Sequence, residues 1–163
     1  MYTVGIITSS DKGYAGERED KSGAVIKEIV EAKGFEVVRY VVLPDEKEML
    51  AKEFKHMADD LGVNLVLSTG GTGFSVRDIT PEATKMVIER ETPGISEAIR
   101  YFSLQITKRA MLSRAASGIR KNTLIVNLPG SPKACKEALD FVLDDIKHGI
   151  DILLGSASEC ARK

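Results

Sequence analysis

The chain alternates between short apolar runs and longer segments in which apolar residues recur every three or four positions. Short runs predict buried strands, and the longer spacing predicts helices with one apolar face. Apolar runs at 3–8, 36–43 and 65–67 are each followed by a segment with helical spacing. Because such alternation places strands side by side with helices packed over them, we predict an α/β fold, a three-layer sandwich with a largely parallel sheet and helices on both faces.

Most of the predicted helices carry an apolar stripe. The stripes consist of Val25, Ile26, Ile29 and Val30; Leu50, Phe54, Met57 and Leu61; Ile95, Ile99, Phe102 and Ile106; and Cys135, Leu139, Val142, Leu143 and Ile146. Another helix is expected at 81–89, the long last helix at 132–147, and a hairpin that joins 115–119 to a strand at 123–128. Core packing explains these stripes without a cofactor, and the same holds for Cys135.

A glycine-rich loop follows the apolar run 65–67. Glycine accepts a positive φ and lets main-chain N–H groups approach an anion, so the loop is either a ligand-binding loop or a plain tight turn. Asp78 comes next, held near the start of a helix that we expect Thr80 to cap and Pro81 to begin. The candidate ligand residues of this loop are Thr69, Gly70, Gly71, Thr72 and Gly73.

Asp45 follows the second predicted strand, between Pro44 and a helix. Its default role in this position is that of a helix N-cap. Sheets of alternating strands and helices place strand ends along one edge, however, so Asp45 and Asp78 can also face a common crevice. Two carboxylates there would hold a divalent metal ion against phosphate oxygens.

Two more loops are candidates for the same edge. The polar loop 9–21 leaves the first strand and is long enough to favour a functional role over a disordered excursion, and Ser22 is expected to cap the helix after it. Ser131 and Pro132 begin the last helix, and Gly130 permits close backbone approach there. This corner is an ordinary cap, a phosphate-binding N-terminus, or both.

Composition narrows the function. A length of 163 residues suits one domain, 1–163, in which 156–163 is expected to be a polar tail. The net charge is −1 and no basic stripe occurs, so we expect no nucleic acid partner. No apolar stretch reaches the length needed to span a bilayer, and we therefore expect a cytoplasmic protein without membrane contact. The two cysteines, Cys135 and Cys160, and the histidines, His56 and His148, form no zinc or nucleophile pattern.

Several motifs follow one another along nearly the whole chain, and the strongest is the stretch from Ser68 to Ala83. The others are Thr-Ser-Ser-Asp at 8–11, Asp-Lys-Ser-Gly at 20–23, Leu-Pro-Asp-Glu at 43–46, Glu-Thr-Pro-Gly at 91–94, Met-Leu-Ser-Arg at 111–114 and Asn-Leu-Pro-Gly-Ser at 127–131. Together these motifs resemble the MogA/MoaB family of molybdenum-cofactor biosynthesis proteins, which includes the gephyrin G domain. The family often has Pro where Lys108 stands, a departure that bears little on the chemistry.

The resemblance implies a molybdopterin adenylyltransferase that transfers AMP from ATP to molybdopterin in the presence of Mg²⁺ and releases pyrophosphate. It implies catalysis and metal binding by Asp45 and Asp78, trimers or multiples of trimers, and contact with other proteins of the same biosynthesis. A MoaB-like molybdopterin-binding or scaffold protein without appreciable transfer is the alternative, and a CinA-type pyrophosphatase domain fits the motifs at 20–23 and 91–94 less well. The implied substrate-binding residues outside the glycine loop are Ser10, Asp11, Asp20, Ser22, Ser113, Arg114, Pro129, Gly130 and Ser131.

Overall fold

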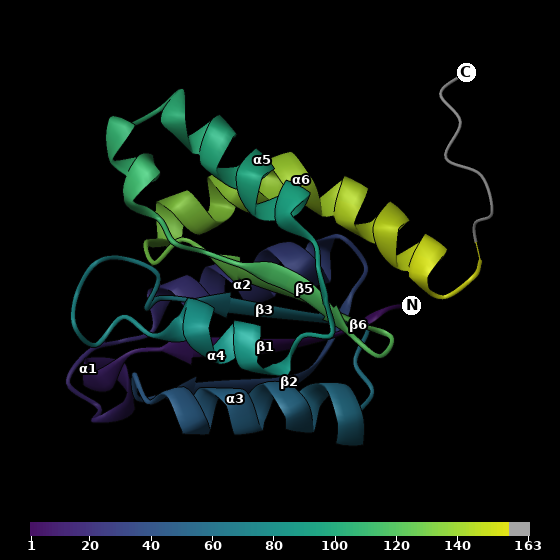
Figure 1. Ribbon diagram of the computed structural model, residues 1–163, viewed down its shortest axis with the longest axis horizontal. Coiled ribbons are helices and arrows are strands. Elements are labelled where there is room, and N and C mark those ends of the chain that lie inside the picture. Colours follow the sequence, from purple (N-terminus) through teal and green to yellow (C-terminus); the bar gives the residue numbers. More distant parts are fainter. Residues whose placement is uncertain (157–163) are drawn as a thin grey trace.

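A computed structural model describes residues 1–156, in which six strands form one mixed sheet (Figure 1). The strands lie in the order β2-β1-β3-β6-β5-β4. The first four in this order are parallel to one another, and β5 is antiparallel to both β6 and β4. Their bounds are β1 Thr3–Ser9, β2 Glu36–Leu43, β3 Leu65–Thr69, β4 Arg90–Glu91, β5 Ser117–Arg120 and β6 Thr123–Leu128.

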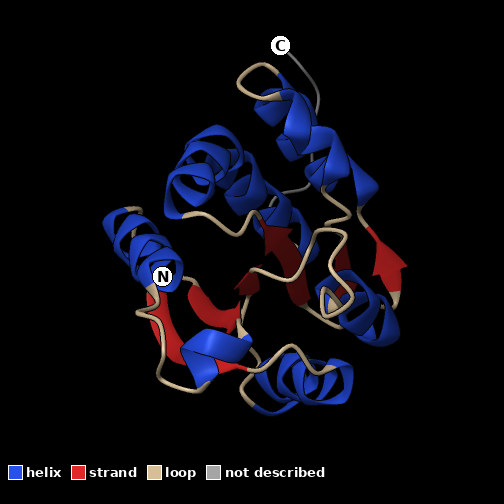
Figure 2. Ribbon diagram, turned by 90° about the vertical axis from the view of Figure 1, so that its left-hand side faces the viewer, coloured by secondary structure: helices blue, strands red, loops and turns tan. Residues whose placement is uncertain are grey.

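Helices cover both faces of the sheet, and in Figure 2 the strands run between them. Helices α2, α5 and α6 pack on one face, and α3 and α4 pack on the other. The prediction of a three-layer α/β sandwich is therefore confirmed. The helices are α1 Asp11–Tyr14, α2 Lys21–Ala32, α3 Lys47–Lys55, α4 Thr80–Val87, α5 Pro93–Leu104 and α6 Pro132–Leu153, with a π-helical turn at His56–Asp60 and a 3-10 turn at Lys108–Leu112.

The two cores follow from the alternation of side chains along the strands. In β1, Val4 and Ile6 face the layer of α2 and α6, whereas Ile7 faces α3 and α4. Successive residues of a strand point to opposite faces, so one fully buried apolar strand supplies both layers. The parallel strands therefore read as continuous apolar runs in the sequence.

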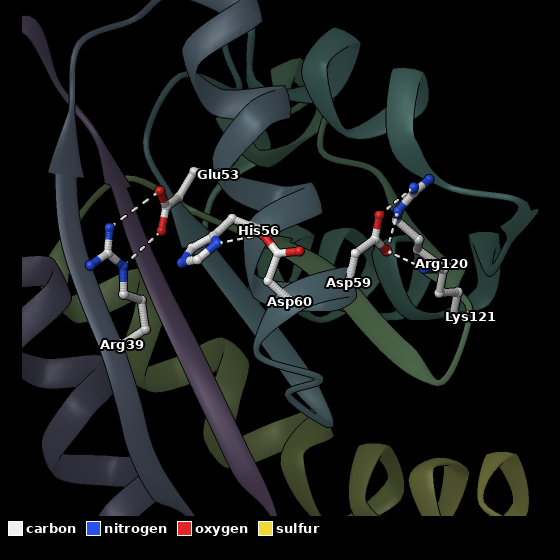
Figure 3. Close-up of polar contacts among 7 residues, drawn as sticks. All are labelled: Arg39, Glu53, His56, Asp59, Asp60, Arg120 and Lys121. Carbon is white, nitrogen blue, oxygen red and sulfur yellow. Dashed lines mark hydrogen bonds and ion pairs between the residues drawn. The ribbon is translucent and has the colours of Figure 1, made fainter.

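The helical pattern after α3 fails at one predicted position. Leu50, Phe54 and Met57 are fully buried, but Leu61 is 44% exposed. The π-helical turn at 56–60 holds an extra residue relative to α-helical spacing, so Leu61 no longer falls on the core-facing side. His56 lies in this turn and pairs with Asp60 at 2.8 Å on the surface (Figure 3).

Other boundaries differ from the predictions in ways that packing explains. Helix α6 continues to Leu153 because Ile150 is fully buried and extends the apolar face beyond Lys147. Ile106 was expected on the stripe of α5, but this helix ends at Leu104 and Ile106 is 51% exposed. The hairpin of β5 and β6 is confirmed.

Two predicted helix caps are wrong. Helix α2 is capped by Asp20, whose carboxylate accepts the N–H of Gly23, and Ser22 instead lies inside the helix. Helix α4 begins at Thr80 itself, and its N-cap Ile79 makes no side-chain bond. Both hydroxyls bond to backbone carbonyls of distant segments, which local sequence patterns do not reveal.

No helix in the described part of the chain is long and apolar enough to cross a membrane. The expected tail at 156–163, which contains Cys160, lies outside the described residues except for Ser156.

Candidate functional site

A cleft of about 780 Å³ opens at the carboxyl ends of the parallel strands. From β1 the chain continues to β2 on one side, whereas β3 lies on the other side of β1, so this edge is a topological switch point. Such points are where open α/β sheets bind ligands. The predicted residues that line the cleft are Ser10, Asp20, Ser22, Asp45, Thr69, Gly70, Gly71, Asp78, Gly130 and Ser131.

The glycine loop makes the floor of the cleft, and two of its residues require glycine. Gly70 and Gly71 have φ values of 87° and 69°. A Cβ on Gly70 would lie 2.4 Å from the carbonyl oxygen of Ser9, and one on Gly71 would lie 2.4 Å from the hydroxyl of Thr80. Thr80 stabilises the turn, since its hydroxyl donates to the Gly70 carbonyl at 2.9 Å. The loop is thus a rigid left-handed turn with its backbone open to the cleft.

Asp45 is not the cap of the helix that follows it. Helix α3 begins at Lys47, and its N-cap Glu46 makes no side-chain bond. The Asp45 carboxylate instead accepts the Ser9 hydroxyl on Oδ1 at 2.7 Å and the N–H of Asp11 on Oδ2 at 3.0 Å. Its place in the cleft is therefore set by the end of β1 and the start of α1, and not by its own helix.

Asp78 reaches the cleft from the loop after β3. Its Oδ2 accepts the N–H of Ser75 at 2.9 Å, and its backbone carbonyl accepts the guanidinium of Arg114 at 2.8 Å. Gly73 leaves room for this carboxylate, because a Cβ there would lie 2.9 Å from Asp78 Oδ2. Within residues 1–156, Oδ1 accepts no hydrogen bond and remains available to a ligand.

These two carboxylates suit the Mg²⁺ that the family resemblance implies. Within residues 1–156 no cluster of three or more His, Cys, Asp or Glu side chains forms a metal cage. Mg²⁺ commonly binds through one or two carboxylates together with substrate phosphates and water. Asp45 and Asp78 line one cleft and match that donor set, so they would hold the ion only together with a phosphate ligand.

Asp20 anchors the wall formed by the start of α2. Its carboxylate accepts the hydroxyls of Thr8, at 2.7 Å, and of Tyr40, as well as the N–H of Gly23. Burial and the neighbouring Asp20 carboxylate raise the pKa of Tyr40 far above its usual value, so the phenol stays a donor. Ser22 ties the same wall to the last helix by donating to the Gly130 carbonyl at 2.7 Å.

The N-terminus of α6 also lines the cleft, next to the start of α2. Ser131 caps this helix as predicted, accepting the N–H of Ala134 at 3.1 Å. The free N–H groups of a first helical turn attract anions. Cys135 behind it is fully buried, as expected for a core residue, and burial raises its pKa to about 11.

The other predicted residues do not line the cleft. Thr72, Ser113 and Pro129 line a neighbouring cavity of about 230 Å³, which meets the cleft at Gly130. Asp11, Gly73 and Arg114 line neither the cleft nor this cavity.

Arg114 is already engaged within the fold. Its guanidinium donates to the carbonyls of Gly73 and Asp78 and pairs with the carboxylate of Glu82. These bonds stabilise the conformation of the loop between β3 and α4. Asp11 lies outside the cleft lining, and the Arg77 guanidinium holds the pKa of its carboxyl below the usual range.

Sequence reasoning missed Arg18 and Lys21, which line the cleft beside Asp20. Both lie in or next to the polar loop after β1, where only hydroxyls and acids were singled out. Among the described residues they supply the cationic side chains of the cleft lining. Basic residues that follow a strand end in this way could have been recognised from the sequence as candidate anion-binding residues. The other lining residues that were missed are Thr8, Ser9, Gly13, Glu19 and Pro132.

Comparison with known proteins gives concordant matches. The model of the family described as probable molybdopterin binding domain matches residues 5–148. A protein of Helicobacter pylori strain J99 named molybdopterin adenylyltransferase is 38% identical over 162 residues, covering 98% of this chain and 92% of the relative. The protein of the same name from Escherichia coli strain K12 is 38% identical, covering 90% of this chain and 78% of the relative.

A solved structure is also similar to this chain in sequence and in fold. The crystal structure of the molybdopterin biosynthesis enzyme MoaB from Thermus thermophilus is 45% identical, with a TM-score of 0.90, and covers 95% of this chain and 98% of that one.

Proposed function

The chain belongs to the family of probable molybdopterin binding domains, and from this premise we propose that it is a molybdopterin adenylyltransferase, an enzyme of molybdenum cofactor biosynthesis. ATP would donate AMP to the terminal phosphate of molybdopterin, and pyrophosphate would be released. Support comes from relatives of that name, which are 38% identical over most of the chain.

The observation that carries the proposal is the placement of Asp45 and Asp78 in one cleft with the Gly70–Gly71 turn. In the reaction, a phosphate oxygen of molybdopterin attacks the α-phosphorus of ATP, and the bond from that phosphorus to the bridging oxygen of the β-phosphate breaks. Two polyanions must approach each other, so the site has to neutralise charge and fix geometry rather than supply a nucleophile.

The residues of the cleft divide these tasks. Asp45 and Asp78 would hold Mg²⁺, which supplies charge neutralisation on the triphosphate when bound. The first turn of α6 offers N–H donors, and Arg18 and Lys21 offer positive charge. The rigid glycine turn lets phosphate oxygens approach the backbone without a side chain in the way.

The direct test incubates the protein with molybdopterin, ATP and Mg²⁺. Formation of adenylylated molybdopterin in equal amounts with pyrophosphate supports the proposal, and omission of Mg²⁺ should abolish both products. Molybdopterin binding without either product would overturn the assignment as a transferase.

That second result would favour a molybdopterin-binding or scaffold protein. The solved structure with 45% identity is described as the molybdopterin biosynthesis enzyme MoaB, a name that specifies neither adenylyl transfer nor a scaffold role, so the alternative is decided by the assay. Equilibrium binding of molybdopterin with no ATP turnover would identify it. For either function we propose a cytoplasmic location and assembly into trimers, with contacts to other proteins of the same biosynthesis.

A further inference from the structure

Three loops of the cleft meet at the exposed residue Arg77. Its Nε and Nη2 donate to the two carboxylate oxygens of Asp11 at 3.0 and 2.9 Å, and Nη2 also donates to Glu46 at 3.0 Å. Asp11 follows β1, Glu46 follows β2 and Arg77 follows β3. A single guanidinium thus joins the loops after three strands of the sheet.

Asp11 is in turn hydrogen-bonded to Asp45. The backbone N–H of Asp45 donates to Asp11 Oδ1, and the backbone N–H of Asp11 donates to Asp45 Oδ2, both at 3.0 Å. Asp11 Oδ1 therefore accepts from Asp45 and from Arg77 at once. The carboxylate of Asp45 is fixed by a residue that does not itself line the cleft.

The sheet order explains why a bridge is needed. Strand β1 lies between β2 and β3, so the strands that precede Asp45 and Asp78 are two strand spacings apart, roughly 10 Å. Arg77 is the chain neighbour of Asp78, and Asp11 is bonded to Asp45. The pair Arg77–Asp11 connects the two acidic residues across the intervening strand.

The ion pair between Arg77 and Asp11 is expected to contribute little to the stability of the fold. The Arg77 side chain is 51% exposed and that of Asp11 is 42% exposed. Ion pairs at such exposure contribute little to folding, but the two-pronged contact fixes orientation. The negative charges of Asp11 and Glu46 also neutralise Arg77, so this cation does not oppose a metal ion bound nearby.

We propose that Arg77 is a positioning residue, which holds Asp45 in register with Asp78 by gripping Asp11. This inference rests on the proposed function, in which both acidic residues act on one metal–phosphate complex. Lysine at position 77 keeps the charge but loses the planar fork, so it should not replace arginine.

The experiment compares Arg77→Lys and Arg77→Gln with a matched control, Arg39→Lys. Arg39 makes a similar two-pronged contact with Glu53 at 2.8 and 3.4 Å on the surface (Figure 3). Neither residue lines the cleft. The Arg39 side chain is 41% exposed, close to the exposure of Arg77. The two measurements are kcat and KM for AMP transfer, and amide hydrogen exchange at Asp45.

Both Arg77 variants should lower kcat by about tenfold to a hundredfold, the scale of a small misplacement of a catalytic group, while KM for ATP changes little. The Asp45 amide should exchange at least about tenfold faster, because its acceptor Asp11 is no longer held. Arg39→Lys should change neither quantity.

Three outcomes would overturn the proposal: unchanged exchange at Asp45, rescue of kcat by Arg77→Lys, or a rise in KM alone, which would indicate direct contact with substrate. The exchange measurement needs no substrate. If the unmodified protein transfers no AMP but exchange at Asp45 responds as expected, the proposed function fails and the structural link from Arg77 to Asp45 stands.

Discussion

The carboxylate of Asp45 accepts two hydrogen bonds within the fold, and that of Asp78 accepts one. Asparagine keeps the shape and one acceptor oxygen but removes the negative charge. At position 45 the remaining oxygen can accept the Asp11 N–H, while the Ser9 hydroxyl can rotate to accept the new amide N–H. The substitution therefore separates the structural role of each residue from the charge that a metal ion needs.

Asp45→Asn and Asp78→Asn should both fold and still bind molybdopterin, but each should lower adenylyl transfer by roughly a hundredfold or more, the scale seen when one element of electrostatic preorganisation is lost. Turnover and Mg²⁺ dependence measured on each variant check this. Near-normal turnover in one variant would remove that residue from the catalytic assignment.

The buried thiol of Cys135 gives a prediction for pH. Its pKa is about 11 in the folded protein, against a usual value of 9.0. The unfolded chain therefore loses this proton first, so the contribution of the thiol to stability is full below pH 9 and is lost as the pH rises to about 11.

The free energy of unfolding, measured by denaturant titration, should fall over that range by about 2 to 3 kcal/mol more in the unmodified protein than in Cys135→Ala. Comparison with the variant cancels the contribution of other titrating groups, including Tyr40, because both proteins contain them. Parallel pH profiles for the two proteins would contradict the prediction.

At the scale of elements, the sequence allowed prediction of those that depend on apolar periodicity. The strands β1, β2, β3 and β6 and the helices α2, α3 and α6 are all found where the pattern indicated. The two-residue strand β4 and the π-helical turn were not predicted, because the first depends on pairing with β5 and the second interrupts a helical pattern.

The candidate site was predictable where glycines and acidic residues follow strand ends. The bonds of Ser22 and Thr80 to distant carbonyls were not, since hydroxyls at those positions suit local caps equally well. The contact of Arg77 with Asp11 joins residues 66 positions apart, and only the sheet order brings them together.

Arg18, just before α2, and Lys21, its first residue, allow a further prediction, because both are cations in a cleft proposed to bind polyanions. The double substitution Arg18→Gln with Lys21→Gln should raise KM for at least one substrate by about tenfold and weaken its dependence on salt, as expected when exposed charges attract a ligand. Steady-state kinetics at two ionic strengths measure both effects.

Lys27→Gln is the matched control. Lys27 lies on the same helix but pairs with Glu31 at 2.7 Å outside the cleft. An equal effect of the control and the double variant would show that the charge of the cleft is unimportant.

At the scale of the whole molecule, we predict a trimer or a multiple of one, as the family resemblance implies. Light scattering on the purified protein at micromolar concentration should give a mass of at least three chains. A monomer mass would contradict this prediction and leave the cleft of a single chain as the complete site.

The position of β6 between β3 and β5 has a consequence for biosynthesis. Because the ribosome makes the chain from its N-terminus, β1, β2 and β3 emerge well before β6. Until residues 123–128 emerge, a nascent chain presents β3 with an unpaired edge, which is a template for aggregation. The corner at Gly130 and Ser131 follows later still. From the synthesis of Asp78 until α6 is complete, the nascent chain therefore carries both acidic residues without a walled site, and it becomes able to enclose a ligand only once α6 has docked.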